Sequence, residues 1–270
     1  MNSKIAFLGP NGTFTHEAAS ILDGELLSVC SIPSVINSVE KGICSKGIVP
    51  IENSIEGPVG LTLDLLVHTD LKIEEEIVLT VNHNLLSTED SDIDDITDVY
   101  SHSQALAQCQ NYLEKHNMKT HFTLSTAAAA KSINSNNSYA AIGTLKAAEI
   151  YGLKVIDRNI QDISNNKTRF IVLSKYEHPL TGHDKTSIIF SLLDDNPGGL
   201  YDILGVFAYN NVNLSKIESR PSKEGLGKYI FFVDFEGHKD NEIIKNILNI
   251  IKTKTSFIKI LGSYPFVDIS

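Results

Sequence analysis

The feature that most constrains this fold is an alternation of short apolar runs with helix-like segments through the first two-thirds of the 270 residues. Residues 4–9, 25–30 and 47–53 are predicted to be strands, because each is a short, largely apolar run. Helices are predicted between them, at 13–22 and 34–42. This rhythm is typical of an α/β sheet.

The same alternation is repeated after the segment 72–86, which predicts a second α/β lobe. The strands expected there are 98–102, 119–124 and 138–143, and the helices are 104–116, 126–134 and one that begins at Thr144. We therefore predict a two-lobed first domain, residues 1–180. One lobe is roughly 1–80 with 160–180, and the other is 81–159.

From Lys185 the order of elements changes. The segments expected are a strand at 186–193, a helix at 198–210, strands at 213–221 and 228–237 with a turn at 223–227 between them, a helix at 241–252 and a last strand near 255–261. This is the βαββαβ order of a ferredoxin-like domain. Residues 177–184 have the proline, glycine and charge of a linker, so we place the boundary near residue 180 and the second domain at 185–270.

Composition excludes several classes of function. The formal charge of −10 and the absence of a long basic run argue against a nucleic-acid partner. The three cysteines include no CxxC pair, so neither a disulfide framework nor a zinc site is indicated. Few apolar residues precede Gly9-Pro10, and no run of 18 apolar residues follows, so we expect a cytoplasmic protein with no membrane contact.

Two polar segments follow predicted strands near the N-terminus. In GPNGTFTHEAA, Gly9 and Gly12 make a turn and Thr13 opens a helix, a geometry that suits either an anion or a purely structural turn. In VPIENSIEGPVG, polar side chains stand where α/β sheets place their ligand crevices, and Gly57-Pro58 is expected to end regular structure. Glu52 and Glu56 could form an acid/base pair, although solvated or capping carboxylates are the more ordinary interpretation.

The predicted helix 104–116 has two contrasting sides. Leu106, Cys109 and Leu113 form an apolar stripe, whereas Gln104 and Gln108, with Ser101 just before the helix, lie opposite. On pattern alone the polar side is a solvated face. His102 and His16 lack a nucleophile motif or metal-ligand spacing, so each is interpreted as a capping or surface histidine.

The segment NNKTRF places positive charge at the start of a strand in an acidic protein. Arg169 can grip a carboxylate with two N–H groups, and Thr168 supplies a hydroxyl beside it. An exposed basic strand end remains the alternative from spacing alone.

Taken together, these motifs closely resemble one family, the prephenate dehydratases with a C-terminal ACT regulatory domain. The segments GPNGTFTHEAA, VPIENSIEGPVGLTLDLL, SHSQALAQC and NKTRF occur in the family's order, and NPGGLYDIL and IESRP are similar to its two ACT signatures. The resemblance covers nearly the whole chain. Two departures are visible, Ser103 where the family usually has proline and Gly199 where it often has alanine.

The resemblance implies a first domain like a two-lobed periplasmic binding protein, with the site in its cleft. It implies the conversion of prephenate to phenylpyruvate, water and carbon dioxide, with no metal or other cofactor. Because an alcohol has too high a pKa to be a strong acid, we interpret Thr168 as a hydrogen-bond donor or proton relay at the leaving oxygen. Arg169 would fix a substrate carboxylate.

The residue roles that the resemblance implies fall into three groups. The catalytic residues would be Thr168, Asn53, Ser101 and Gln108. The substrate-binding residues would be Thr13, Glu52, Ser54, Lys167, Arg169 and Phe170. The effector L-phenylalanine would bind at an interface of two ACT domains through Gly198, Gly199, Leu200, Glu218, Ser219, Arg220 and Pro221, in a homo-oligomer expected to be a tetramer built from dimers.

Two other functions stay open at this point. Arogenate dehydratase uses the same chemistry on the aminated substrate, and the sequence does not choose between them. A non-catalytic, two-lobed sensor of a small acid would need the Arg169 clamp but would have no use for the Thr168 hydroxyl.

Overall fold

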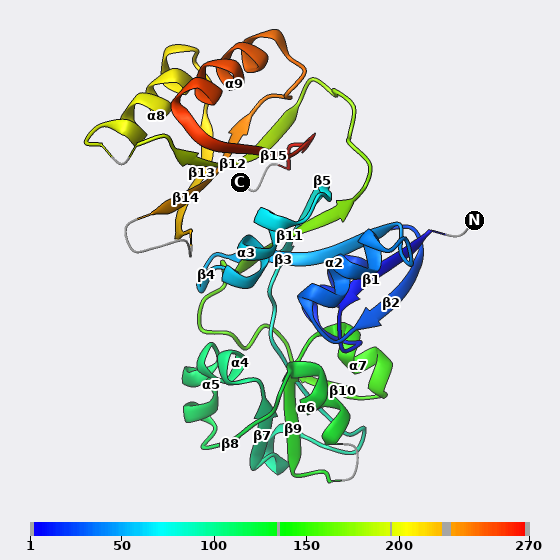
Figure 1. Ribbon diagram of the computed structural model, residues 1–270. Coiled ribbons are helices and arrows are strands. Elements are labelled where there is room, and N and C mark those ends of the chain that lie inside the picture. Colours follow the sequence, from blue (N-terminus) through cyan, green and yellow to red (C-terminus); the bar gives the residue numbers. More distant parts are fainter. Residues whose placement is uncertain (1–2, 134–135, 195, 223–227, 268–270) are drawn as a thin grey trace. The chain divides into compact units, whose positions relative to one another are not determined.

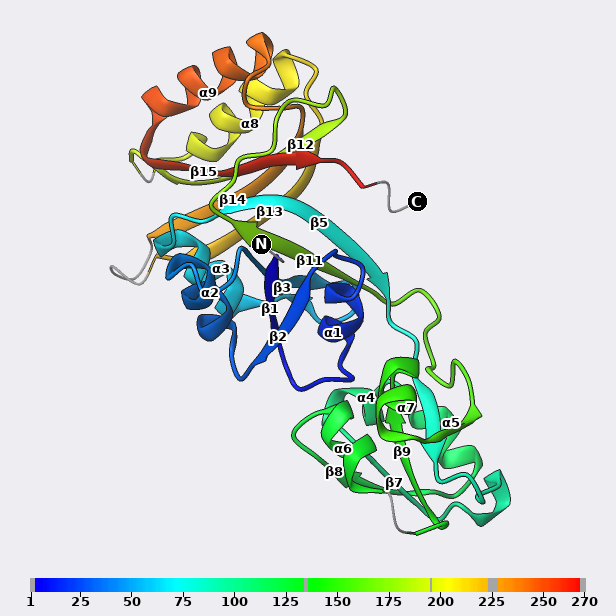
Figure 2. The same ribbon diagram turned by 90° about the vertical axis from the view of Figure 1, so that its right-hand side faces the viewer.

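The computed structural model describes residues 3–133, 136–194, 196–222 and 228–267, and Figures 1 and 2 show it from two sides. The turn predicted at 223–227 lies outside the described residues. The chain forms two compact units, Met1–Thr62 with Val78–Phe170, and Leu63–Ile77 with Ile171–Ser270. In the part that is described, no helix is long and apolar enough to cross a membrane.

The first sheet has the strand order β2-β1-β3-β11-β5, and a short strand, β4, pairs with β3. Its strands are β1 (Lys4–Leu8), β2 (Glu25–Val29), β3 (Lys46–Asn53), β4 (Gly57–Pro58), β5 (Lys72–Thr80) and β11 (Lys167–Ser174). β1 pairs in parallel with both β2 and β3. Because β11 lies beside β3, the end of one strand and the start of the other are neighbours although they are far apart in the sequence.

The helices that accompany this sheet are α1 (Phe14–Ala19), α2 (Ile32–Glu40) and α3 (Gly60–His68). α2 shows why the sequence forms a helix here. Ser31 caps its N-terminus by accepting the Ser34 N–H at 3.2 Å, and Val35 and Val39 on one side are buried. The cap supplies a partner for a free N–H group, and the apolar side binds the helix to the core.

The expectation that Gly57-Pro58 would end regular structure is wrong. These two residues form β4, which pairs antiparallel with Glu52 and Asn53, because Gly57 adopts φ +80° and so allows the tight return of the chain. α3 follows at once and was not predicted. Its apolar residues are spread around the helix, with Leu63 and Leu66 fully buried, so the segment lacks the one-sided pattern of an amphipathic helix.

The second sheet has the order β10-β6-β9-β7-β8. Its strands are β6 (Asn84–Ser87), β7 (Asp98–Ser101), β8 (Lys119–Phe122), β9 (Tyr139–Gly143) and β10 (Lys154–Asp157). Its helices are α4 (Ser103–Ala107), α5 (Gln110–Lys115), α6 (Thr126–Ser132) and α7 (Leu145–Tyr151). A 3-10 turn, η1 (Ile93–Asp95), lies in the acidic segment 87–95. β7 pairs in parallel with β8 and β9, whereas β6 pairs antiparallel with β9 and β10.

The single helix expected at 104–116 is broken into α4 and α5 at Gln108. The main-chain oxygen of Gln108 accepts the Asp162 N–H at 2.7 Å, which occupies a carbonyl that a continuous helix would use. The apolar stripe is confirmed, because Leu106, Cys109 and Leu113 all lie in the core of this lobe.

The ferredoxin-like order of the C-terminal region is confirmed. Its elements are β12 (Asp184–Leu192), α8 (Gly199–Tyr209), β13 (Leu214–Pro221), β14 (Tyr229–Glu236), α9 (Glu242–Lys254) and β15 (Thr255–Pro265). The sheet order is β13-β14-β12-β15, and Figure 2 shows both helices on one face of this sheet. A core that includes Phe190, Phe207 and Phe235 lies between the sheet and the helices. The predicted fold class, a two-lobed α/β region with a ferredoxin-like domain, is thus confirmed.

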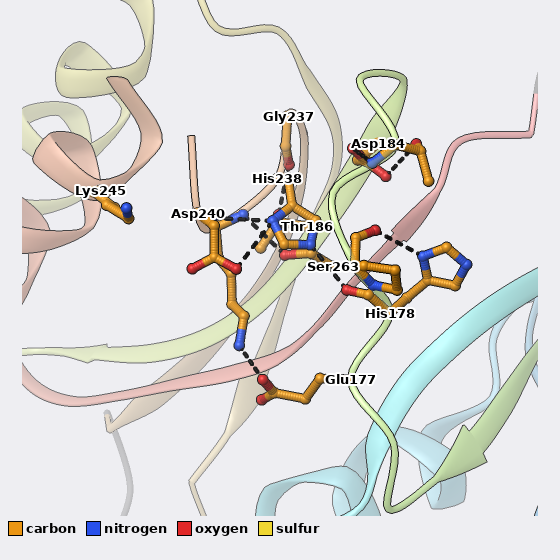
Figure 3. A network of polar contacts seen from close by, with 12 residues as sticks. Glu177, His178, Asp184, Thr186, Gly237, His238, Asp240, Lys245 and Ser263 are labelled. Carbon is orange, nitrogen blue, oxygen red and sulfur yellow. Dashed lines mark hydrogen bonds and ion pairs between the residues drawn. The ribbon is translucent and has the colours of Figure 1, made fainter. Parts of the chain in front are cut away.

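The segment between β11 and β12 is anchored to the ferredoxin-like domain by polar contacts (Figure 3). The His178 oxygen accepts a hydrogen bond from His238 Nε2 at 3.0 Å, and Glu177 pairs with Lys239. His238 is 2% exposed, and its Nδ1 accepts the Asp240 N–H at 3.1 Å. Although its composition is that of a linker, this segment is therefore held in place.

Three cations of the ferredoxin-like domain contact α3 and β5, which belong largely to the same compact unit. Lys185 Nζ lies 2.8 Å from Glu76 Oε1, and both side chains are almost fully buried. Arg220 Nε donates to Asp64 Oδ1 at 3.0 Å. Lys259 Nζ donates to main-chain oxygens at the end of α3. β5 and α3 are therefore bound to this domain by charge as well as by packing.

Candidate active site

A cavity of about 520 Å³ is lined by residues from both α/β lobes. Its polar lining includes Thr13, Asn53, His83, Gln108, Asn166 and Thr168. Four of these, Thr13, Asn53, Gln108 and Thr168, are residues that the sequence singled out. The structure therefore brings together side chains from the ends of β3 and α4, the start of β11 and the cap of α1.

Asn53 and Thr168 are adjacent because β3 ends where β11 begins. Asn53 Oδ1 accepts the main-chain N–H groups of Ile55 at 2.9 Å and Glu56 at 3.0 Å. Asn53 Nδ2 in turn donates to Thr168 Oγ1 at 2.8 Å. The Thr168 oxygen is thus an acceptor in this contact, and among the described residues no acceptor takes its proton. The hydroxyl is left able to donate.

Gln108 and Asn166 extend this network across the cavity wall. Asn53 Nδ2 also donates to Asn166 Oδ1 at 2.7 Å, and Asn166 Nδ2 donates to Gln108 Oε1 at 3.0 Å. The same Gln108 oxygen lies 2.9 Å from His83 Nε2. In the described structure, Gln108 Nε2 is buried and has no hydrogen-bond partner. An unpaired buried amide is costly, so this group is suited to meet a ligand oxygen.

His83 has an apolar environment. Its side chain is 3% exposed, and the ring of Phe14 meets it edge-on with centroids 5.5 Å apart. Burial lowers the pKa of His83 below its ordinary value of 6.5, and the hydrogen bond to Gln108 opposes this only in part. His83 is therefore neutral near pH 7.

Six of the predicted site residues do not line the cavity: Glu52, Ser54, Ser101, Lys167, Arg169 and Phe170. Arg169 is 4% exposed, and its Nη1 donates to Glu52 Oε1 at 2.9 Å. The two charged side chains that were expected to face a substrate therefore form an ion pair with each other at the strand ends. Ser101 is fully buried and donates to the Ile142 oxygen at 2.8 Å. Glu52 is likewise not poised beside Glu56 as an acid/base pair, because its carboxylate holds Arg169.

Ser54, Lys167 and Phe170 have local structural contacts. The Lys167 N–H donates to Ser54 Oγ at 2.9 Å, which joins the chain after β3 to the start of β11. Phe170 is 1% exposed and belongs to the core. Sequence spacing could not separate these residues from Asn53 and Thr168, because Ser54 directly follows Asn53 and because Lys167 and Phe170 lie within two residues of Thr168.

The glycine turn before α1 is held by the second lobe. Gly12 has φ +90°, and a Cβ there would lie 3.1 Å from Ala147 in α7. The Gly12 oxygen accepts a hydrogen bond from Thr144 Oγ1 at 2.9 Å. Thr13 caps α1 by accepting the His16 N–H at 3.3 Å, although it also lines the cavity. The turn is therefore structural, and it also forms part of the cavity wall.

Of the two histidines interpreted as capping or surface residues, His102 is confirmed as a cap, because it is the N-cap of α4 and accepts the Gln104 N–H at 3.4 Å. His16 is not a cap, because it lies within α1, whose N-cap is Thr13, and its Nδ1 accepts the Gly12 N–H at 3.0 Å. His16 is nearly buried rather than at the surface. Within the described residues, no group of three or more His, Cys, Asp or Glu side chains could hold a metal ion.

His83 and Asn166 are the functional candidates that sequence reasoning missed. His83 lies between two asparagines in the segment 72–86, to which no role was assigned from the sequence, and this polar interruption of an apolar stretch was the available signal. Asn166 begins the NKTRF motif and is 1% exposed. Buried polar side chains of this kind are expected to have partners, but only the fold shows which partners they have.

The predicted effector residues occupy two places in the ferredoxin-like domain. Gly198 has φ +90° and is the N-cap of α8, which begins at Gly199, and Leu200 packs against the domain core. Glu218, Ser219, Arg220 and Pro221 end β13, an edge strand. Exposure alternates along β13, and Ser219 and Pro221 are on the exposed side whereas Arg220 pairs with Asp64.

Comparisons with known proteins identify the family. The model of the prephenate dehydratase family matches residues 5–178, and that of the ACT domain matches residues 186–252. A prephenate dehydratase of Methanocaldococcus jannaschii is 43% identical over 99% of this chain and 100% of its own length. Among solved structures, the prephenate dehydratase of Arthrobacter aurescens in complex with L-Phe has a TM-score of 0.90 and 33% identity, and covers 99% of this chain and 91% of its own.

A protein described as a novel type of quorum-quenching acylase, GqqA, has a similar structure, with a TM-score of 0.89, 27% identity and 98% of both chains covered. Fold alone therefore does not specify the reaction. The family is shown by the match to its model over residues 5–178 and by the full-length identity to a curated member. This chain belongs to the prephenate dehydratase family and carries a C-terminal ACT domain.

Proposed function

We propose that this chain converts prephenate to phenylpyruvate, water and carbon dioxide in the cavity that contains Thr168. Loss of the ring carboxylate as carbon dioxide sends its electron pair through the ring and expels the ring hydroxyl. One proton is taken up to make water, and the product ring is aromatic. The enzyme needs to bind a dianion, orient the two departing groups and assist the leaving oxygen.

The observation that carries this proposal is the orientation of the Thr168 hydroxyl. Because Thr168 Oγ1 accepts from Asn53 Nδ2 at 2.8 Å, its proton is available to a ligand oxygen in the cavity. A neutral donor suits a reaction that needs a hydrogen bond at the departing oxygen more than it needs a strong acid. Gln108 Nε2 offers a second neutral donor in the same wall.

The geometry supports a positioning role for Arg169, in place of the direct substrate clamp that the sequence suggested. Its contact with Glu52 lies at the ends of β3 and β11, next to Asn53 and Thr168. The pair therefore stabilises the two strand ends that present the cavity donors. Substrate carboxylates would be bound by neutral side-chain donors and main-chain N–H groups.

Arogenate remains the alternative substrate, since it differs from prephenate in the side chain and not in the ring that reacts. A non-catalytic sensor is disfavoured by the oriented hydroxyl, which binding of an acid alone would not require. Residues 185–270 would regulate turnover through L-phenylalanine bound between ACT domains. The working species would be a tetramer built from dimers, in the cytoplasm.

Turnover by the purified full-length chain tests the proposal. With prephenate we expect phenylpyruvate, and with arogenate much slower release of phenylalanine. Addition of millimolar phenylalanine should lower the rate. A chain that binds prephenate but does not form phenylpyruvate would be a sensor, whereas faster turnover of arogenate would reassign the substrate.

A further inference from the structure

In the hydrogen-bond network of the cavity wall each donor and acceptor can be assigned, because the network starts at main-chain N–H groups. Asn53 Oδ1 accepts the N–H groups of Ile55 and Glu56, which can only donate. The other end of this amide, Nδ2, must therefore face Asn166 and Thr168. The two ends of an asparagine amide are usually distinguishable only from their partners, and here the partners are unambiguous.

The assignment of donors and acceptors extends from Asn53 through Asn166 to Gln108. Since Asn53 Nδ2 donates to Asn166, the acceptor there is Oδ1, and Asn166 Nδ2 is the end that faces Gln108 at 3.0 Å. Gln108 must then present its oxygen, Oε1. Its Nε2 is the opposite end of the amide, which is buried and has no partner among the described residues.

The same logic determines the protonation of His83. Gln108 Oε1 cannot donate, so the contact of 2.9 Å requires a proton on His83 Nε2. In the neutral ring Nδ1 then carries no proton, and this atom is also buried without a hydrogen-bond partner in the described structure. The groups that face the ring are the Gln108 amide and the Phe14 ring, and the His83 main-chain N–H donates to Gln161 Oε1 at 2.9 Å.

We propose that His83 is a positioning residue: its Nε2–H and the Asn166 amide together hold Gln108 Oε1, which directs the Gln108 NH₂ group toward a substrate oxygen. A flipped Gln108 would place that NH₂ group against the Asn166 NH₂ group and would lose the hydrogen bond from His83 Nε2–H. Asn166 thus sets the orientation of Gln108, and His83 adds a second hydrogen bond that holds it. This inference rests on the proposed dehydratase reaction, because it concerns a donor used in that reaction.

The role does not require His83 to change its charge. Protonation would add an N–H at Nδ1, an atom that is buried and has no acceptor in the described structure. Burial also lowers the pKa of His83, so the neutral form persists below pH 6.5. His83 acts here through hydrogen-bond direction and not as a general acid or base.

Three substitutions of His83 provide a matched test. His83→Gln places an amide nitrogen near the position of Nε2, His83→Asn places one nearer to Nδ1 and too short to reach Gln108, and His83→Leu has no donor. We expect the Asn and Leu variants to lose about 10–100-fold in kcat, less than the ~10²–10³-fold typical of removing a transition-state donor itself. The Gln variant should regain most of the loss. Equal activity of all three variants, at melting temperatures like the parent's, would overturn the proposal.

A double-mutant cycle asks whether His83 acts through Gln108. In a Gln108→Ala background, changing His83→Asn should alter kcat by less than about twofold, because the group that it positions is gone. Fully additive losses would show that His83 acts independently of Gln108. If the His83→Leu variant does not fold, the comparison of His83→Asn with His83→Gln still tests the proposal.

A spectroscopic measurement separates this inference from the proposed function. Imidazole nitrogen chemical shifts of the ¹⁵N-labelled protein should show Nε2 protonated and Nδ1 bare for His83 from pH 6.5 to 8. The opposite tautomer would overturn the network direction whatever the enzyme does. If the parent protein does not turn over prephenate but the tautomer is as stated, the proposed reaction fails and the network stands without its catalytic role.

Discussion

Thr168 is the residue on which the proposed chemistry depends most directly. Thr168→Ala removes the oriented hydroxyl, so we expect kcat to fall by ~10²–10⁴, the usual contribution of a positioned proton donor. Thr168→Ser keeps an oxygen that can accept from Asn53 and should retain more activity. Initial rates at saturating prephenate, with melting temperatures as the control for folding, test this. Parental turnover in the alanine variant would remove Thr168 from the mechanism.

Arg169 offers a test of structure against substrate binding. Arg169→Lys keeps the charge but loses the planar fork that meets Glu52, and we expect the free energy of unfolding to fall by about 1–3 kcal/mol. A reference at the surface is Lys245→Met, which removes the cation of a more exposed ion pair with Glu242 altogether and should still cost less than ~1 kcal/mol. Urea denaturation measures both. A raised KM with unchanged stability would instead indicate direct contact with the substrate.

His83 also makes stability depend on pH. Its pKa in the folded protein is below 6.5, so the unfolded chain takes up a proton first as pH falls. Well above pH 6.5, His83 is unprotonated in both the folded and the unfolded protein, so it has no effect on how stability depends on pH. Below pH 6.5 the unfolded chain binds the proton more readily, and the parent loses folding stability by at most ~1.4 kcal/mol per pH unit. The difference in unfolding free energy between the parent and His83→Gln should therefore shift in favour of the variant between pH 7.5 and 5. A pH-independent difference would contradict a buried, neutral His83.

At the scale of elements, α3 connects two functional regions along the chain. It follows β4, whose Gly57 and Pro58 line the cavity, and it carries Asp64, which pairs with Arg220 of the predicted effector segment. An effector that binds better when this pair is formed, or when it is broken, would be coupled to α3. The helix that the sequence did not predict is therefore the element to test for regulation.

Asp64→Asn should weaken inhibition by phenylalanine while kcat stays close to the parent's. The expected change is a severalfold rise in the concentration for half-inhibition, within the ~5–150-fold typical of allosteric coupling. The control is Asp70→Asn, the same loss of charge at an exposed position just after α3. Equal inhibition of the parent and both variants would exclude the Asp64–Arg220 pair from the response.

At the scale of the whole molecule, the Glu76–Lys185 pair ties β5 to the ferredoxin-like domain. Both side chains are almost fully buried, so Lys185→Met leaves a buried carboxylate without this cation, and we expect a loss of about 3–5 kcal/mol. The double variant Glu76→Gln/Lys185→Met should lose much less, which chemical denaturation would measure. Additive losses would show that the two residues act separately.

The contacts between β5 and the ferredoxin-like domain also determine which experiment can test inhibition by phenylalanine. Gly262 in β15 lies so close to β5 that a Cβ there would be 2.2 Å from the Ile73 oxygen. Removal of residues 181–270 would strip both this packing and Lys185 from β5. Point variants in the full chain are therefore a better test of phenylalanine inhibition than a truncated protein.

The sequence by itself determined the α/β alternation, the βαββαβ order, the family and four residues of the cavity wall. These depend on local periodicity and on motifs that are contiguous in the chain. Only the tertiary structure decided that Ser101 and Arg169 are withdrawn from the cavity, and that His83 and Asn166 belong to it. The physical reason is that a polar side chain's role depends on which partner it meets when buried, and here the partners come from strands far apart in the sequence.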